Sequence, residues 1–244
     1  ERFAEFVSSD CLHSKIFKWQ NNVIVYRTEC ILPNKQNSRP PLLLVFGNPA
    51  SHSVASGMFF SYQGDRQEHA IWNVLNRSGI LSFPSPRGDE SRGNLEELMQ
   101  SRKNSLLDEL NYCSPFRVGF VVYYSMPTPA TGKWNGVSGL RRLLASKALA
   151  KICEAEKQRI DEIISDFMTP NGAVIAFQKD AYSGIKSPDS PDYRLVQAKE
   201  GELVGECQCN FDIRLFGMPP TRPYYRNLSI RLLQNIKAQV LQVH

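Results

Sequence analysis

The chain has 244 residues, of which 42% are hydrophobic and 22% are charged. These fractions exclude a disordered, collagen-like or low-complexity protein, and the length is sufficient to bury a continuous core. The longest apolar stretches, 42–46 and 118–124, are far shorter than the roughly 18 residues that a membrane span requires. The first nine residues lack the basic and then apolar pattern of a secretory signal. We therefore expect an intracellular protein, cytoplasmic or nuclear, with no membrane partner.

Lys and Arg outnumber Asp and Glu by 29 to 24, which gives a net charge of +5. Residues 213–244 contain basic residues and no acidic one, so the excess can be assigned to this end of the chain. Such a segment suits the phosphate backbone of a nucleic acid, although the solvated face of a helix gives the same pattern. The spacing of the six cysteines matches neither a zinc site nor a secreted disulfide framework, and we expect no metal and no cofactor.

The first part of the chain leads into a buried strand. Residues 1–41 include a β-rich stretch at 23–26 and end in a Pro-rich loop. We interpret them as an N-terminal extension packed on a single domain that spans 1–244. Residues 42–46 are continuously apolar, which predicts a strand buried on both faces, followed by a loop over 47–60. Asp65 and Glu68 have the spacing of a capping box before a short helix that ends at Gly79.

Strands and helices then alternate to the end of the chain. The apolar spacing predicts helices over 95–110, about 140–167 and 228–240, and strands over 118–124, 173–177 and 211–216. The polar segment 183–206 shows no helical pattern. Strands separated by helices indicate an α/β protein, specifically a three-layer α/β/α sandwich around a central, mostly parallel sheet of four strands.

Ligands of such sheets bind beyond the carboxyl ends of the strands, which selects the loops 47–60, 124–136, 178–185 and 217–225. The chain has no G-x-G-x-x-G, Walker A, H-E-x-x-H or G-x-S-x-G motif, so dinucleotide, P-loop, zincin and α/β-hydrolase sites have no direct support. Ser51 and His52 could form a nucleophilic pair, but adjacent residues rarely face each other.

The loop after the first buried strand carries the most specific pattern. Gly47, Asn48 and Pro49 follow the strand directly, and Phe60 stands twelve residues beyond Asn48. This arrangement resembles motif I of the uracil-DNA glycosylase superfamily, in which a carboxylate or an Asn precedes Pro and a later Phe stacks on the flipped base. The helix at 68–80 looks like the one that follows this loop in the mismatch-specific branch of that superfamily.

The resemblance covers roughly residues 42–241 and implies a monofunctional DNA glycosylase. Such an enzyme hydrolyses the N-glycosidic bond of uracil or another damaged base during base excision repair, and we expect it to act as a monomer on DNA with a flipped base. Asn48 would hold the attacking water and Phe60 would stack on the base, with Gly47 and Pro49 beside it. An amide is a poor general base, so the reaction should be slower than with a carboxylate. The structural alternatives are a turn residue for Asn48 and loop packing for Phe60.

Residues 211–225 look like the last strand and motif II of the same superfamily. The resemblance implies DNA contacts for a group of residues in and after this loop: Met218, Pro219, Thr221, Arg222 and Arg226. Arg222 stands where the single-strand-selective branch has an Arg wedge that fills the space left by the flipped base. Arg226 would contact phosphate.

The chain departs from the family at two positions. Tyr124 stands where uracil readers have an Asn, and a phenol does not offer paired donor and acceptor groups. Met218 replaces the His or Asn that stabilises the departing base anion, a loss that typically costs about 100- to 1000-fold in rate. Lys179 is a candidate to supply the charge that Met218 cannot offer to the departing base. Lys179 and Tyr124 are also candidates for binding the base. Two alternatives therefore stay open: a weakly active or inactive member of the superfamily that binds DNA or a nucleotide, and an unrelated small-molecule enzyme.

Overall fold

The computed structural model describes residues 2–21, 23–61, 68–84 and 95–242. Its central sheet has six strands in the order β3-β5-β4-β6-β8-β7. The four inner strands are β5 (Arg117–Val122), β4 (Pro41–Phe46), β6 (Ala173–Phe177) and β8 (Asn210–Met218), and they are parallel. The edge strands β3 (Cys30–Ile31) and β7 (Val204–Cys207) are antiparallel to their neighbours. The predicted α/β class is confirmed, but the predicted number of four strands is wrong because the two short edge strands were missed.

The inner strands are apolar without interruption because both of their faces are buried. All six residues of β4 are buried, and their side chains alternate between two hydrophobic clusters. Leu42, Leu44 and Phe46 join the cluster on one face of the sheet, whereas Leu43 and Val45 join the cluster on the other. A strand that faces two cores has no polar side, which explains why its sequence does not alternate.

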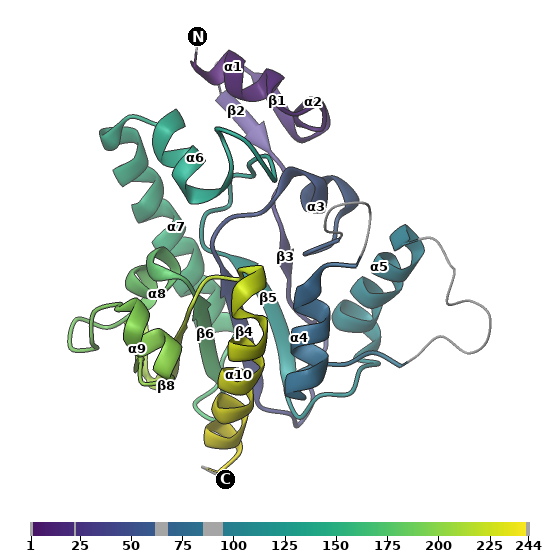
Figure 1. The fold of residues 1–244 in the computed structure, drawn as a ribbon, viewed down its shortest axis with the longest axis vertical. Helices are drawn as coiled ribbons and strands as arrows, with labels where there is room; N and C mark the ends of the chain where they lie inside the picture. The colour runs from purple at the N-terminus through teal and green to yellow at the C-terminus, as the bar shows by residue number, and fades with distance from the viewer. Residues whose placement is uncertain (1, 22, 62–67, 85–94, 243–244) are drawn as a thin grey trace.

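Helices cover both faces of the sheet (Figure 1). The first cluster includes residues of α4 (Ala70–Ser78), α5 (Leu95–Asn104), the π-helical turn Ser105–Glu109 and α10 (Arg226–Leu241). The second cluster includes residues of α3 (Ser51–Ser56), α6 (Gly136–Leu143), α7 (Ser146–Phe167), α8 (Lys179–Ile185) and α9 (Leu195–Glu200). Among the residues that the structure describes, no helix is both long and apolar enough to cross a membrane.

Several predicted boundaries are corrected. The long helix predicted at 140–167 is two helices, α6 and α7, which are separated by an extended Leu144 and Ala145. The loop at 47–60 contains the short helix α3, and the polar segment at 183–206 contains α9. Helix α4 is capped by His69. Asp65, the predicted first residue of the capping box, lies outside the described residues.

Residues 1–41 contribute to the sheet as well as packing against the domain. They form α1 (Arg2–Ser8), α2 (His13–Ile16) and the hairpin of β1 (Phe17–Gln20) with β2 (Val23–Tyr26), in agreement with the strand predicted at 23–26. The buried side chains of Phe6, Ile16 and Phe17 belong to the second cluster. The same segment supplies edge strand β3, which pairs with β5.

Candidate functional site

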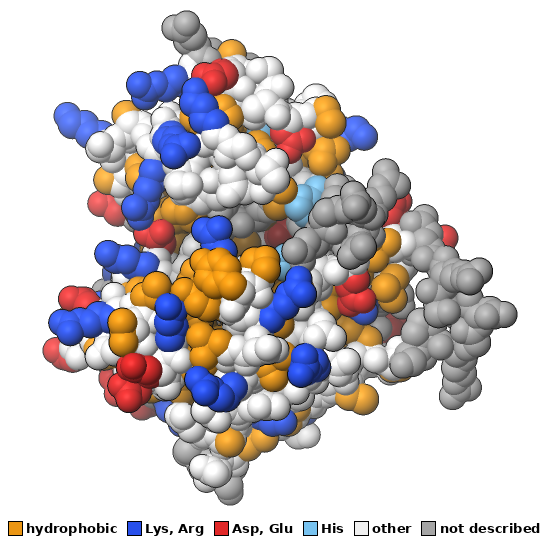
Figure 2. Space-filling model, in the orientation of Figure 1, with side chains coloured by type: hydrophobic (Ala, Val, Ile, Leu, Met, Phe, Trp, Pro, Cys, Tyr) orange, Lys and Arg blue, Asp and Glu red, His pale blue; other side chains and the backbone are white. Residues whose placement is uncertain are grey.

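A cavity of about 750 Å³ lies at the carboxyl ends of the parallel strands. The last residues of three strands, Phe46 of β4, Val122 of β5 and Phe177 of β6, form part of its wall. Residues at the beginnings of α3, α4, α6 and α10, loop residues that precede these helices, Glu29 and Gln178 form the rest. Figure 2 looks onto the side of the molecule that carries α10, where a central hollow has Lys and Arg side chains on part of its border and histidine atoms at its edge. The position agrees with the general rule for ligand sites in open α/β sheets.

Asn48 lines this cavity with its amide held in one orientation. The amide nitrogen donates hydrogen bonds to Thr128 Oγ1, at 2.8 Å, and to the carbonyl oxygen of Pro49, at 3.3 Å. A carbonyl oxygen only accepts, so the nitrogen must face Pro49, and the carboxamide oxygen remains as an acceptor. Thr128 Oγ1 also accepts from the backbone N–H of Gly136, at 2.9 Å, and this bond ties Asn48 to the beginning of α6. The side chain can therefore present an oxygen to a water molecule or a ligand.

Phe60 lines the same cavity and has an unusual backbone conformation. Its φ angle is +47°, in the left-handed region that side chains with a Cβ rarely adopt. The ring is partly buried, with its centroid 4.8 Å from that of Phe46 and 4.6 Å from that of His69. Its carbonyl oxygen accepts a hydrogen bond from the Trp72 indole N–H, at 3.0 Å, which holds the turn in place. The structure thus brings Phe60 and Asn48 to one cavity.

His69 is a cavity residue that the sequence did not single out. Its Nδ1 accepts a hydrogen bond from the backbone N–H of Ile71, at 3.1 Å, so the neutral ring carries its proton on Nε2. Burial, reinforced by His52 and Arg226, lowers the pKa of His69 to about 4. The imidazole is therefore neutral at physiological pH.

Glu29 reaches the cavity from the residue before edge strand β3 and was also missed. The residue is only 6% exposed, and its Oε1 has no hydrogen-bond partner among the described residues. Burial raises the pKa of this carboxyl group well above its ordinary value, and Lys103 opposes the shift. Glu29 is a single acidic residue in a region without a recognisable motif, so its sequence context does not indicate that it lines a cavity.

Gln178 follows β6 directly and supplies a second amide to the cavity. Its φ angle is +84°, a strained value for a residue other than glycine, and its buried Nε2 has no hydrogen-bond partner among the described residues. The amide lies against Gly47, where a Cβ atom would collide with Nε2. Gly47, which also lines the cavity, therefore makes room for Gln178. The sequence pointed instead to the next residue, Lys179.

Four predicted base-binding or DNA-binding residues are not among the residues that line the cavity: Tyr124, Lys179, Met218 and Pro219. Strand β5 ends at Val122, two residues earlier than predicted, and Tyr124 packs into the second cluster with its hydroxyl 3.4 Å from Cys153 Sγ. Burial raises the pKa of Tyr124. Lys179 is exposed at the first position of α8. Strand β8 continues through Met218, whose side chain is 1% exposed and belongs to the first cluster.

The loop between β8 and α10 forms one rim of the cavity. Pro219 is buried and is not among the lining residues, but Thr221, Arg222 and Arg226 are. Both arginines are exposed, which gives this rim a positive charge. The predicted residues Asn48, Pro49, Phe60, Thr221, Arg222 and Arg226 therefore meet at one opening.

Ser51 pairs with a residue far away in the sequence and not with His52. Its hydroxyl lies 2.9 Å from His13 Nε2, and both residues are fully buried. The other ring nitrogen of His13 lies 3.0 Å from the carbonyl oxygen of Phe6. Because no substrate can reach this pair, it anchors residues 1–41 to α3 and does not act as a nucleophile.

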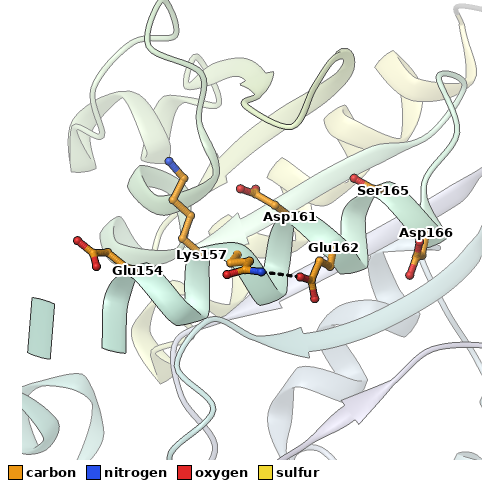
Figure 3. A pocket seen from close by; sticks show the side chains of 7 residues that line it. Glu154, Lys157, Asp161, Glu162, Ser165 and Asp166 are labelled. Carbon is orange, nitrogen blue, oxygen red and sulfur yellow. Dashed lines mark hydrogen bonds between the residues drawn. The ribbon is translucent and has the colours of Figure 1, made fainter. Parts of the chain in front are cut away.

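A second hollow lies along the outer face of α7 (Figure 3). Its lining side chains all come from this one helix: Glu154, Lys157, Gln158, Asp161, Glu162, Ser165 and Asp166. The amide of Gln158 donates to Glu162, one turn along the helix, at 2.9 Å. A charged row on one helix is typical of a solvated surface, so we place the candidate site in the cavity of Asn48 and Phe60.

In the parts of the chain that the structure describes, no group of three His, Cys, Asp or Glu residues could hold a metal ion. No model of a known protein family matches the chain, and no curated protein matches its sequence.

Proposed function

We propose that this chain is a monofunctional DNA glycosylase of the uracil-DNA glycosylase superfamily, acting on uracil or another altered base. The observation that carries the proposal is that Asn48 and Phe60 line one cavity at the carboxyl ends of the parallel strands. In this proposal the helices on the two faces of the sheet are the outer layers of the three-layer fold of that superfamily.

The cavity suits a base that has been rotated out of DNA. The glycosidic bond is inaccessible inside the stacked duplex, so the base must be flipped into a pocket with flat apolar walls. Phe60 and Phe46 supply aromatic walls, and the exposed Arg222 and Arg226 at the rim are positioned to contact phosphates. The size of the cavity, about 750 Å³, is sufficient for a nucleobase with its sugar.

Asn48 would act on the water that attacks the sugar carbon. Its amide nitrogen is engaged with Thr128 and Pro49, and its oxygen can accept a hydrogen bond from that water. The amide orients the water without removing a proton efficiently, because its basicity is low. A slow monofunctional hydrolysis is the activity that this arrangement supports.

The test is excision from labelled oligonucleotides that contain uracil, hypoxanthine, xanthine or mismatched thymine, in single- and double-stranded form. Abasic sites are converted to strand breaks with alkali and counted. We expect at least one lesion to be released, and Asn48→Ala to lose most of the activity while still binding DNA. Asn104→Ala, an exposed residue of α5 outside the cavity, is the matched control. Activity that is unchanged in Asn48→Ala would remove the assignment of the water-holding group.

One observation favours a second candidate function. The side chain of Met218 is buried in the core, so the last residue of β8 offers no hydrogen-bond donor to a departing base. A protein that binds DNA or a nucleotide in the same cavity without cleaving it would tolerate this residue. Retention of lesion-containing DNA with no strand break on any substrate would support this second function and reject the first.

A further inference from the structure

Glu29 is positioned at the aromatic wall of the cavity by the pairing of the edge strand. Cys30 of β3 pairs with Val121 of β5, so Glu29 stands beside the end of β5, next to Val122. Ile31, two residues later, packs into the first cluster with Phe46 and Phe120. Because alternate residues of a strand share a face, the carboxyl group is on the same side of the sheet as the ring of Phe60, which packs against that cluster.

One oxygen of this carboxyl group is buried without the partner that a buried charge requires. Glu29 is 6% exposed and lines the cavity, and its Oε1 has no hydrogen-bond partner among the described residues. An ionised carboxylate in an apolar site without hydrogen bonds is strongly disfavoured, whereas the neutral acid is tolerated. The neutral acid has an O–H group that can donate a hydrogen bond to a ligand in the cavity.

The proposed reaction requires a donor to the departing base, and Met218 at the end of β8 does not supply one. Cleavage of the glycosidic bond leaves negative charge on the departing base, and the buried thioether of Met218 cannot donate to it. We propose that Glu29, in its protonated form, is the acid that donates to the departing base. This inference rests on the proposed function and adds to it a catalytic group from a different part of the chain.

The step balances without any further reactant. The bond between the sugar carbon and the base nitrogen breaks, and both of its electrons stay with the base. The proton of Glu29 moves to the base, and the oxygen of the water held by Asn48 bonds to the sugar carbon. The remaining proton of that water passes to the Glu29 carboxylate through solvent in the open cavity. The products are the neutral base, an abasic sugar with a new hydroxyl group, and protonated Glu29.

The charged and titratable groups around Glu29 set the direction of the pH dependence. Lys103 of α5 acts on the carboxyl group and favours ionisation. His52 of α3, His69 before α4, and Arg222 and Arg226 near α10 line the same cavity. His69 is neutral near pH 7. The rate should therefore fall as the pH rises through the pKa of Glu29, because the donor proton is lost.

Glu29→Gln tests the role because an amide is nearly isosteric and stays neutral but has no acidic proton to transfer. We expect it to lower the single-turnover rate on the released lesion by about 100-fold, the typical loss for one donor to a developing anion. The dissociation constant for DNA should change less than threefold. The fall in rate at high pH should disappear. Glu162→Gln, an exposed glutamate of α7, is the matched control and should behave like the wild type.

A change of leaving group separates catalysis from a structural role. Fluorine at carbon 5 of uracil withdraws electrons and stabilises the departing anion, so 5-fluorouracil depends less on an acid. The loss in Glu29→Gln should be at least tenfold smaller for 5-fluorouracil than for uracil or for another weaker leaving group in the same series. Equal losses for all bases, or a variant within threefold of the wild type, would overturn the role of Glu29.

The protonation state is measured independently of activity. The ¹³C resonance of the Glu29 side-chain carboxyl, assigned by its absence in Glu29→Gln, should report the protonated form at pH 7. An ionised Glu29 at pH 7 would overturn this inference and leave the glycosylase function standing. A wild-type protein that releases no base from any lesion would instead reject the proposed function, and the role of Glu29 with it.

Discussion

The neutral form of His69 should make the stability of the fold depend on pH in a defined direction. Burial, with smaller contributions from His52 and Arg226, lowers the pKa of His69 from 6.5 to about 4. In the unfolded chain the ring titrates near its ordinary value. Because the pKa is lower in the folded state, the contribution of His69 to the unfolding free energy is fully present above pH 6.5. It is lost as the pH falls toward 4.

The size of the effect follows from the same two values. One pKa unit corresponds to 1.36 kcal/mol, so the fall from 6.5 to about 4 gives at most about 3 kcal/mol of unfolding free energy. Solvent reaches part of the ring and screens its charge, which places the measured value below this limit.

His69→Asn isolates this contribution. Asn keeps an acceptor for the Ile71 N–H at the beginning of α4 but does not titrate. Urea unfolding of the two proteins should give free energies within about 1 kcal/mol of each other at pH 7.5. As the pH is lowered to 4, the wild type should lose up to about 3 kcal/mol more than the variant. Parallel pH profiles would refute the reasoning, because every other titrating group is present in both proteins.

Further outcomes follow for the cavity, its rim and the core. Asn48→Asp should raise the single-turnover rate at least tenfold at pH 7 by supplying a true general base, and an unchanged or lower rate with intact DNA binding would contradict this. Gly47→Ala should displace the amide of Gln178, because the new Cβ collides with it, and weaken excision while the thermal midpoint falls only slightly. Met218→Ala should reduce the unfolding free energy by about 2–5 kcal/mol without a change in DNA affinity, as measured by denaturation and fluorescence anisotropy. Arg222→Ala should reduce the slope of log K against log salt by about 1 and impair duplex more than single-stranded substrates; equal impairment would reject a wedge.

The inner strands could be predicted because burial on two faces leaves a local signature. Residues 42–46 and 173–177 are continuous apolar runs, and the structure confirms both as strands β4 and β6. Strand β3 has two residues and pairs only at the edge of the sheet, so no run of side chains marks it. The break between α6 and α7 also lacks a breaker residue, because Leu144 and Ala145 occur readily within helices.

The site could be predicted only where its residues follow one another along the chain. Asn48 and Phe60 belong to one loop, and Arg222 and Arg226 to another, so local patterns indicated them. Tyr124 and Met218 were assigned from the expected ends of β5 and β8. Strand β5 ends earlier and strand β8 ends later than predicted. The side chains of Tyr124 and Met218 both pack into the core.

The sequence alone therefore determined the α/β class, the parallel inner strands and the loop that bears Asn48 and Phe60, because each depends on residues close together in the chain. Only the tertiary structure brought Glu29 and Gln178 to that loop. Glu29 arrives through antiparallel pairing at the edge of the sheet, and Gln178 through the parallel neighbours of β6. Their burial and their unpaired polar atoms are properties of the assembled cavity, since neither the pairing nor the loss of water is encoded by adjacent residues.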